Sequence, residues 1–155
     1  MSTAQTWQTV STNLDDTLKL AETIGRRFKG GEVVELISDL GGGKTSFVRG
    51  LVAGMGSHGH VHSPSFTLSN EYKAKGLTLH HFDFHRLNEP GIMRNELTEI
   101  IQDPQNVVAV EWADIVENVL PAQRLVVRIT PTSDNERQVI FEYPKELKYL
   151  IPSNT

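Results

Sequence analysis

The sequence predicts an α/β fold in three layers, with helices on both faces of a central, mixed and partly parallel sheet. Early in the chain, apolar strands alternate with amphipathic helices, which is typical of parallel strands joined by helical crossovers. Late in the chain, short strands are separated by polar turns, which indicates hairpins and therefore antiparallel pairing. A glycine-rich turn with the residues GGGKT stands between a strand and a helix, at the edge where open sheets bind ligands.

Composition and charge narrow the class of protein. The chain has 155 residues, and we expect a single domain over residues 1–155. With a net charge of −4, a role around RNA is expected to run through a partner. The chain has no cysteine, which excludes disulfides and thiolate metal sites and fits a cytoplasmic protein. Neither a secretory leader nor an apolar run of the roughly 18 residues that span a membrane is visible, so no membrane contact is expected.

The first predicted helix follows capping side chains at residues 11–13 and ends at Gly30 and Gly31. Its apolar positions recur at helical spacing: Leu14, Leu18, Ala21, Ile24 or Gly25, and Phe28. Residues 32–38 then form a strand, a tight turn follows at residues 41–43, and a second helix ends at Gly56. The apolar stripe of this second helix consists of Phe47, Val48, Leu51, Val52 and Met55.

The rest of the chain alternates in the same way. Strands are expected at residues 66–72, 77–84, 106–112, 124–130 and 137–143. The first two form a hairpin around residues 73–76, and the last two form a second hairpin. A helix within residues 90–103 has Ile92 or Met93, Leu97, Ile100 and Ile101 on its buried side. The segment after Pro144 has few apolar side chains and is expected to be loosely held.

The turn between the first strand and the second helix has the chemistry of a phosphate-binding loop. Small residues at Gly41–Gly43 let successive N–H groups converge on one anion, and the helix N-terminus adds a positive end. Lys44 can reach the β- and γ-phosphates of ATP, and the Thr45 hydroxyl can bind Mg²⁺. The predicted fold is therefore P-loop NTPase-like. The alternative is a glycine-rich turn that precedes Lys-Thr by chance.

One position departs from the usual pattern of such loops. Ser38 stands where the pattern has its first glycine. If the backbone there needs a positive φ, serine costs roughly 1–2 kcal/mol relative to glycine, and if φ is negative the cost is small. We therefore expect Ser38 to lower nucleotide affinity modestly and not to abolish binding.

Two predicted apolar strands end in an acid. Asp83 closes the run LHHFD, and Glu111 closes VVAVE. Carboxylates at strand ends beside the loop can hold Mg²⁺ or its waters, or orient an attacking water. The predicted catalytic residues are therefore Lys44, Asp83 and Glu111, and the predicted metal ligands are Thr45, Asp83 and Glu111. Which acid binds the metal directly stays open, and each acid alone can also be a solvated strand end.

Four segments, in this order and spacing, resemble the TsaE family: SDLGGGKTSFVRGL, HSPSFTLSNEY, LHHFDFHRL and VVAVEWAD…VLP. The resemblance runs from about Leu14 to Phe141. Members of that family are small P-loop ATPases needed to make threonylcarbamoyladenosine, at the adenosine next to the anticodon of tRNA. The resemblance implies ATP and Mg²⁺ as cofactors, TsaB and TsaD as partners, and indirect contact with tRNA.

The resemblance also implies residue roles. Ser65 and Thr67 match a switch-like segment that senses the γ-phosphate, and Trp112 matches a motif tryptophan beside Glu111. The adenine would lie near residues 13–15 and near Asp134. The implied nucleotide-binding residues are Asn13, Leu14, Asp15, Leu40, Gly41, Gly42, Gly43, Lys44, Thr45, Ser65, Thr67, Asp83, Trp112 and Asp134.

Other features stay open. Phe84-His85 replaces the leucine-tyrosine common in the family, and Arg86 can pair with phosphate, with a partner carboxylate or in a surface salt bridge. His58, His60 and His62 alternate, but the glycines and proline around them favour a loop over a metal site. His80 and His81 point to opposite faces of a strand, so at most one faces the nucleotide. Trp112 can stack, form a lid or complete the core edge.

The favoured function is a slow ATPase that acts as a nucleotide switch read by a partner enzyme. Its first rival is a small-molecule kinase, for which a chain of 155 residues leaves little room for an acceptor pocket and a basic lid. Its second rival is a nucleotide-dependent binding module without catalysis.

Overall fold

The computed structural model describes residues 4–38, 43–57, 69–84 and 91–152, and for residues 91–93 and 115 it describes the backbone alone. The helices in these ranges are α1 (Leu14–Arg26), α2 (Lys44–Gly54) and α3 (Gly91–Gln102), with the 3-10 helices η1 (Ala113–Val119) and η2 (Lys145–Leu150). The strands are β1 (Gln5–Ser11), β2 (Val33–Ile37), β3 (Ser69–Ala74), β4 (Leu77–Asp83), β5 (Asn106–Glu111), β6 (Leu125–Pro131) and β7 (Arg137–Tyr143). Within these ranges no helix is both long and apolar enough to cross a membrane.

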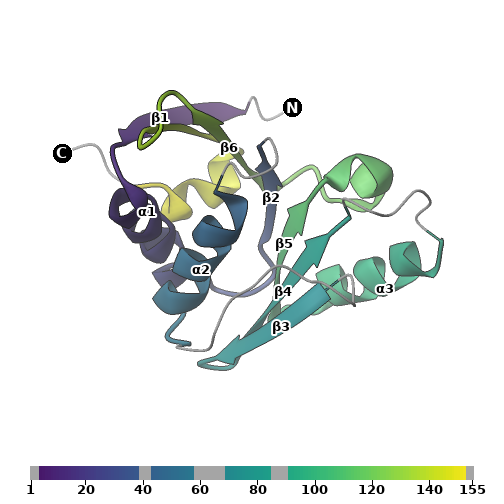
Figure 1. Ribbon diagram of the computed structural model, residues 1–155. Coiled ribbons are helices and arrows are strands. Elements are labelled where there is room, and N and C mark those ends of the chain that lie inside the picture. Colours follow the sequence, from purple (N-terminus) through teal and green to yellow (C-terminus); the bar gives the residue numbers. More distant parts are fainter. Residues whose placement is uncertain (1–3, 39–42, 58–68, 85–90, 153–155) are drawn as a thin grey trace.

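The strands form one seven-stranded sheet in the order β1-β7-β6-β2-β5-β4-β3. Strands β6, β2, β5 and β4 run parallel to one another, whereas β1, β7 and β3 pair antiparallel with their neighbours. Helices α1, α2 and η2 pack on one face of the sheet, and α3 and η1 pack on the other (Figure 1). This arrangement confirms the predicted three-layer, P-loop NTPase-like sandwich with a mixed sheet.

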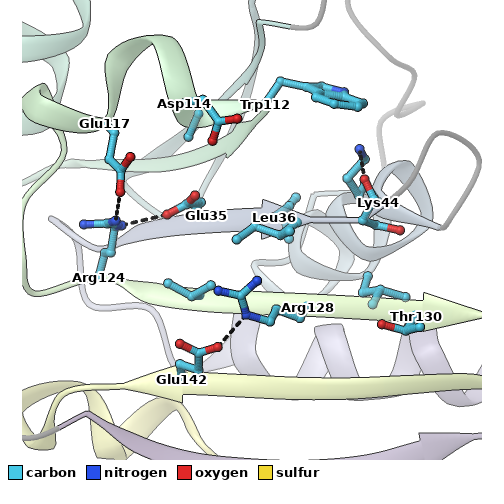
Figure 2. Close-up of a pocket in the computed structure, with 15 residues that line it drawn as sticks. Glu35, Leu36, Lys44, Trp112, Asp114, Glu117, Arg124, Arg128, Thr130 and Glu142 are labelled. Carbon is cyan, nitrogen blue, oxygen red and sulfur yellow. Dashed lines mark hydrogen bonds and ion pairs between the residues drawn. The ribbon is translucent and has the colours of Figure 1, made fainter.

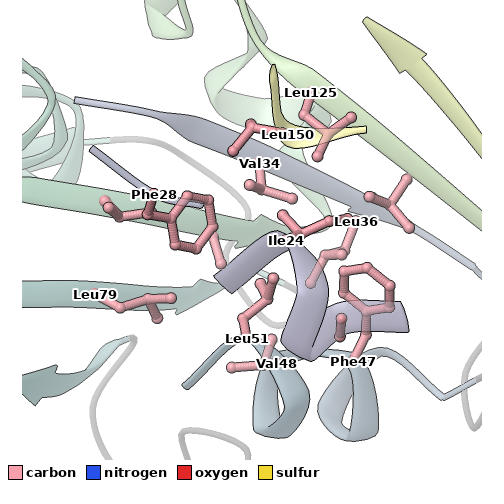
Figure 3. Packing of buried hydrophobic residues seen from close by; sticks show 14 of the residues in the cluster. Ile24, Phe28, Val34, Leu36, Phe47, Val48, Leu51, Leu79, Leu125 and Leu150 are labelled. Atoms are coloured by element: carbon pink, nitrogen blue, oxygen red, sulfur yellow. The ribbon is translucent and has the colours of Figure 1, made fainter. Parts of the chain in front are cut away.

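The larger core lies between the sheet and helices α1 and α2 (Figure 3). Every residue of the stripe predicted for α2 is buried there: Phe47, Val48, Leu51, Val52 and Met55. These side chains share one cluster with Val34 and Leu36 of β2 and with Leu150 of η2. Full burial of a side chain of this size contributes roughly 1.5–3 kcal/mol. This cluster is therefore the main apolar contribution to folding.

The opposite face of the sheet is covered in part. Leu97 of α3 and Val116 of η1 share a smaller cluster with Val110 of β5. The side chains of β6 and β7 on this face include Arg128 and Glu142, which are 46% and 34% exposed and form an ion pair. The described helices leave this half of the face open (Figure 1). The open half of this face therefore includes a charged pair, whereas the covered half carries apolar side chains.

Helices α1 and α2 approach each other backbone to backbone. A Cβ added at Gly25 of α1 would lie 2.2 Å from the carbonyl oxygen of Leu51 on α2. A Cβ added at Gly54 of α2 would lie 2.2 Å from the carbonyl oxygen of Glu22 on α1. Both distances are far inside van der Waals contact, and each neighbour is helix backbone. The two helices can therefore pack at this distance only because these positions have no side chain.

The buried face of α1 differs from the predicted stripe at its start. Leu14 is 54% exposed, although it was expected in the stripe, whereas Ala21 and Ile24 are fully buried. Thr17 is buried in its place, with its hydroxyl 2.6 Å from that of Ser11. Because the two hydroxyl groups hydrogen-bond to each other, Thr17 can be buried although it is polar. The spacing of apolar residues in the sequence therefore does not identify this buried position.

The sequence does not predict strand β1. Its residues are mostly polar and exposed, because it is an edge strand that pairs only with β7, from Gln5↔Tyr143 to Ser11↔Arg137. Its anchor is Trp7, whose ring stacks on Phe141 at a centroid distance of 5.2 Å. One aromatic anchor in a polar strand leaves almost no alternating hydrophobic signal.

The C-terminal segment packs more tightly than its sequence led us to expect. Residues 145–150 form η2, and Leu147, Leu150 and Ile151 join the larger core. The Tyr149 hydroxyl donates a hydrogen bond of 2.6 Å to Glu32, which is 3% exposed. Burial and the Glu32 carboxylate raise the pKa of Tyr149 well above its usual value. The few apolar side chains of a six-residue 3-10 helix do not form a recognisable period, so the sequence did not predict this packing.

Both predicted hairpins are confirmed. Strands β3 and β4 pair antiparallel, and β3 continues to Ala74, two residues beyond the predicted end, so that the turn falls at Lys75 and Gly76. Both turn residues have a positive φ, 56° and 81°, as a two-residue hairpin turn requires. Strands β6 and β7 form the second hairpin. Ile92 and Met93, expected on the buried side of α3, lie outside the described side chains, while Leu97 is buried.

We predict that Gly54→Ala destabilises the protein. Alanine favours a helix interior over glycine by about 1 kcal/mol, so a gain would follow if the site had room. The added methyl group would instead meet the Glu22 carbonyl, and overpacking of this kind costs about 1–3 kcal/mol net. Urea unfolding measures the effect, with the exposed α2 position Arg49→Ala as the control. A variant more stable than the wild type would contradict the close-packing interpretation.

We also predict that Tyr149→Phe lowers the free energy of unfolding by about 1–2 kcal/mol at pH 7–8, because a charge-assisted hydrogen bond is lost. The folded-state pKa of Tyr149 is raised, so the stability from this hydroxyl is present below pH 10 and is lost as the pH rises above that. Wild type and variant should therefore converge in alkaline solution. Chemical unfolding at a series of pH values tests this, and a constant difference up to the highest pH would refute it.

Candidate functional site

The two predicted strand-end acids lie side by side. Strands β4 and β5 are parallel neighbours, and Asp83 is in register with Glu111. Alternation along β5 places Glu111 on the same face as the buried Ala109, which is the face covered by α1 and α2. Glu111 is 3% exposed. The structure therefore brings both acids to the carboxyl edge of the sheet, beside the start of α2.

Lys44, the first residue of α2, reaches into this edge. Its side chain is buried, and its Nζ donates a hydrogen bond of 3.0 Å to the carbonyl oxygen of Ser38. The same Nζ lies 3.9 Å from Oε1 of Glu111 and 4.4 Å from the centre of the Trp112 ring. Figure 2 shows Lys44 and Trp112 facing each other. Three separate segments, the end of β2, the end of β5 and the turn after β5, thus converge on one ammonium group.

The loop before α2 is described from Gly43 onward. Gly43 is the N-cap residue with φ of 104°, a left-handed conformation that favours glycine, and it has no side chain to cap the helix. Among the described non-glycine residues, positive φ occurs at Lys75 and Trp112, so Ser38 does not have it. The serine at the first pattern position therefore carries no backbone strain of the left-handed kind.

Trp112 connects β5 to η1 in a left-handed conformation, with φ of 58° and ψ of 52°. This conformation costs a bulky L-residue roughly 1–2 kcal/mol. The turn sends the indole back over Lys44, where ring and ammonium attract each other. Trp112 is 37% exposed, so of the roles considered from the sequence it fits a cover over Lys44 better than a part of the core.

His81 is a site residue that the sequence analysis did not select. It is 0% exposed, and its Nε2 lies 2.5 Å from Oε2 of Glu111. His80 points to the opposite face and contacts Asn106 at 3.1 Å. The two histidines point to opposite faces of β4, as the alternation of strand residues predicted. The register of β4 against β5 is what brings His81 to Glu111.

A second feature is a cavity of about 240 Å³ between the N-termini of α1 and α2, which we call the helix cavity. Its lining residues are Asn13, Leu14, Thr17, Gly43, Ser46, Asp134, Asn135 and Arg137. The family resemblance implied an adenine near residues 13–15 and near Asp134, and residues of these two stretches line the same cavity. Asp15 is in the first turn of α1 but not among the lining residues. Thr17, Ser46, Asn135 and Arg137 were not selected from the sequence, because no motif marks them.

Hydrogen bonds hold both walls of the helix cavity. On α1, Asn13 Oδ1 accepts from the N–H of Asp16 at 2.8 Å, and Asp16 accepts from the hydroxyl and the N–H of Thr12, which lowers the pKa of Asp16. On the β6–β7 turn, the Arg137 guanidinium donates to the carbonyl oxygens of Ser133, Asp134 and Glu136. Each wall therefore has a defined backbone shape.

A third feature is an open groove of about 650 Å³ on the other face of β2 and β6, which we call the sheet groove (Figure 2). It starts at Lys44 and Trp112 and is bounded by η1 and the uncovered strands. Arg124 bridges Glu35 at 2.9 Å and Glu117 at 3.9 Å across it. The groove charges are thus largely paired within the protein.

Several predicted residues lie outside the described parts of the chain: Leu40, Gly41, Gly42, Ser65, Thr67, Arg86, His58, His60 and His62. Thr45 is half-buried in the first turn of α2. In the ranges that the structure does describe, no three acidic or histidine side chains cluster as a metal site. Mg²⁺ commonly takes only one or two protein carboxylates and completes its shell with phosphate oxygens and water, so Thr45, Asp83 and Glu111 remain a suitable oxygen donor set.

The fold and the site together define a P-loop NTPase-like α/β protein, with a lysine at the start of the helix after β2 and acids at the ends of β4 and β5. Residues 11–139 match the family model described as threonylcarbamoyl adenosine biosynthesis protein TsaE. The chain belongs to the TsaE family, as its motifs predicted.

Similar proteins cover most of the chain. The tRNA threonylcarbamoyladenosine biosynthesis protein TsaE of Bacillus subtilis is 37% identical over 139 residues, which is 87% of this chain and 83% of that protein. The protein of the same name from Treponema pallidum is 32% identical over 84% of this chain and 96% of its own length. The crystal structure of YdiB from Bacillus subtilis superposes with a TM-score of 0.76 at 28% identity and covers 97% of this chain and 94% of that one.

For the glycine-replacing serine we predict that Ser38→Gly changes ATP affinity by less than about tenfold, because no positive φ has to be relieved. Gly43→Ala is the matched comparison: its φ of 104° is unfavourable for alanine although the site has room for a methyl group. That variant should lose about tenfold or more. Isothermal titration calorimetry with a non-hydrolysable ATP analogue measures both, and a gain of more than about tenfold in Ser38→Gly would refute the prediction.

Proposed function

We propose that this protein is an ATP-binding, slowly hydrolysing P-loop ATPase that acts as a nucleotide switch in the biosynthesis of threonylcarbamoyladenosine in tRNA. The family membership supports the pathway. The observation that carries the nucleotide chemistry is the buried contact between Lys44 and Glu111, at the sheet edge where Asp83 also ends its strand.

The electrostatics of this contact favour a polyphosphate. Lys44 and Glu111 are both nearly excluded from water, where an ion pair is stable only while each charge keeps a partner. A triphosphate at the loop would offer Lys44 several anionic oxygens in exchange for the single Glu111 oxygen at 3.9 Å. Glu111 would then be released from the lysine and become available to a magnesium ion or a water molecule. The same residues thus hold each other without nucleotide and hold the nucleotide when it binds.

The helix cavity supplies a place for the base. Leu14 is 54% exposed at its edge, which is an apolar surface that a purine ring can cover. Asn135, Arg137 and Asp134 offer polar groups on the opposite wall. Gly43 borders both this cavity and the start of the loop helix, so a base in the cavity and phosphates at the loop belong to one ligand.

Magnesium supplies charge neutralisation at the β- and γ-phosphates when it is bound with ATP. The chain's own contribution is the hydroxyl of Thr45 and the carboxylates of Asp83 and Glu111, all oxygen donors of the kind that Mg²⁺ prefers. Lys44 neutralises phosphate charge and aligns the terminal phosphate, while Glu111 or Asp83 orients the attacking water. The sequence has no arginine finger placed by a motif, so we expect hydrolysis by the isolated chain to be slow.

The implied partners, TsaB and TsaD, would respond to the nucleotide state of this protein. Contact with tRNA would be indirect, through these partners. Under this proposal the nucleotide state orders the segment with Ser65 and Thr67, and the partner enzyme responds to that order. Hydrolysis then resets the complex. The chain carries a net charge of −4, which fits a role in which a partner and not this chain grips the RNA.

The sheet groove favours one alternative function, a small-molecule kinase. A kinase needs an acceptor pocket next to the phosphates, and a groove of about 650 Å³ opens at Lys44. Two of its arginines, Arg124 and Arg128, already pair with Glu35 and Glu142, and so offer less charge to an acceptor. The two functions differ in their products, because hydrolysis releases inorganic phosphate and a kinase does not.

We predict that the purified protein releases phosphate from ATP and Mg²⁺ at well under about one turnover per second, and that TsaB and TsaD with tRNA accelerate it. Lys44→Ala should weaken ATP binding at least about tenfold, because a charged hydrogen-bonding group is lost. Glu111→Ala should bind ATP but hydrolyse it much more slowly than the wild type. Calorimetry and a phosphate-release assay measure the two quantities separately.

Arg26→Ala, in the exposed last turn of α1, serves as the control and should leave both quantities unchanged. ADP formation without phosphate release, dependent on an added acceptor, would replace the proposal by a kinase. Partner binding that survives Glu111→Ala with no change in the cycle would replace it by a binding module.

A further inference from the structure

The environment of His81 is asymmetric. The ring is fully buried on β4, and Nε2 lies 2.5 Å from Oε2 of Glu111 on β5. The other ring nitrogen, Nδ1, is buried and has no hydrogen-bond partner among the residues that the structure describes. A buried N–H without an acceptor costs more than a buried lone pair without a donor. The arrangement therefore favours a proton on Nε2, which donates to Oε2 of Glu111.

Glu111 consequently uses its two oxygens differently. Oε2 accepts from His81, while Oε1 faces Nζ of Lys44 at 3.9 Å. A carboxylate held by a single contact can rotate, but one that is held at Oε2 from within the sheet presents Oε1 in one direction. That direction is the side of Lys44, where the phosphates would lie.

We propose that His81 is a positioning residue: its Nε2–H holds Oε2 of Glu111, so that Oε1 stays aimed at the phosphate side of the site. This rests on the proposed function for the chemistry that Glu111 performs, but not for the contact itself. Partners that hold a functional carboxylate or imidazole in place typically matter by about 10–100-fold in activity or metal affinity when removed.

The chain contains a matched control. His80 is the adjacent residue on the same strand, is also nearly buried, and makes a hydrogen bond to Asn106 on the opposite face of the sheet. Replacing either histidine by leucine removes one imidazole and one interstrand hydrogen bond from β4. Only the His81 replacement touches Glu111.

The experiment measures single-turnover ATP hydrolysis, nucleotide affinity and thermal stability for five proteins: wild type, His81→Leu, His81→Gln, His80→Leu and Glu111→Gln. We expect His81→Leu to slow the chemical step about 10–100-fold and to leave nucleotide affinity within about threefold. His81→Gln keeps an N–H donor and should recover part of the loss. His80→Leu should hydrolyse ATP at the wild-type rate even if its melting temperature falls.

A double variant completes the test. If His81 acts through Glu111, adding His81→Leu to Glu111→Gln should slow hydrolysis no further. The proposal is overturned if His81→Leu hydrolyses ATP at the wild-type rate, if His80→Leu and His81→Leu lose activity equally, or if the two effects add in full.

A readout without activity separates this proposal from the proposed function. The ¹⁵N spectrum of the imidazole reports which nitrogen carries the proton. The expected result is the Nε2–H form in the wild type. If the wild type fails to hydrolyse ATP, the proposed function falls, and the spectrum still decides the positioning contact: a ring without a proton on Nε2 would overturn it.

Discussion

The close approach of α1 and α2 sets the position of everything at the carboxyl edge of the sheet. Gly25 and Gly54 let each helix backbone touch the other, so the distance between the two helices is fixed by main-chain atoms and not by adaptable side chains. The N-terminus of α1 forms one wall of the helix cavity, and the N-terminus of α2 carries Lys44. A shift of either helix would therefore move the base site relative to the phosphate site.

The buried charges at that edge make a second constraint, because each is stable only while its partner stays. Lys44 depends on Glu111 and the Ser38 carbonyl, and Glu111 depends on Lys44 and His81. Such a set contributes little net stability, since desolvation offsets the attraction. It does specify one arrangement of the end of β2, the end of β5 and the start of α2. Strand β2 links this arrangement to the sheet groove, because Leu36 faces the core and Glu35 faces the groove.

Much of this fold could be predicted from the amino-acid sequence. Strand β5 and helix α2 carry unbroken or regularly spaced apolar residues, and the strand-end acids followed from where those runs stop. Strand β1 and helix η2 were missed, because an edge strand with one aromatic anchor and a 3-10 helix of six residues produce no recognisable period. The contact between His81 and Glu111 needs the register between two strands, and the left-handed turn at Trp112 needs tertiary structure to hold it. The local residue pattern of the sequence predicts neither the histidine contact nor the left-handed turn.

The strand order also governs how the protein can be made. Strand β2 pairs with β5 and β6, which are synthesised some seventy or more residues later. Strand β1 pairs with β7, which is the last strand in the sequence that the structure describes. A nascent chain therefore has the apolar β2 without both sheet partners until Pro131, the last residue of β6, has been synthesised. Contacts this distant in sequence slow folding. The seven-stranded sheet can be completed only after β7 has been synthesised, because β1 pairs with β7.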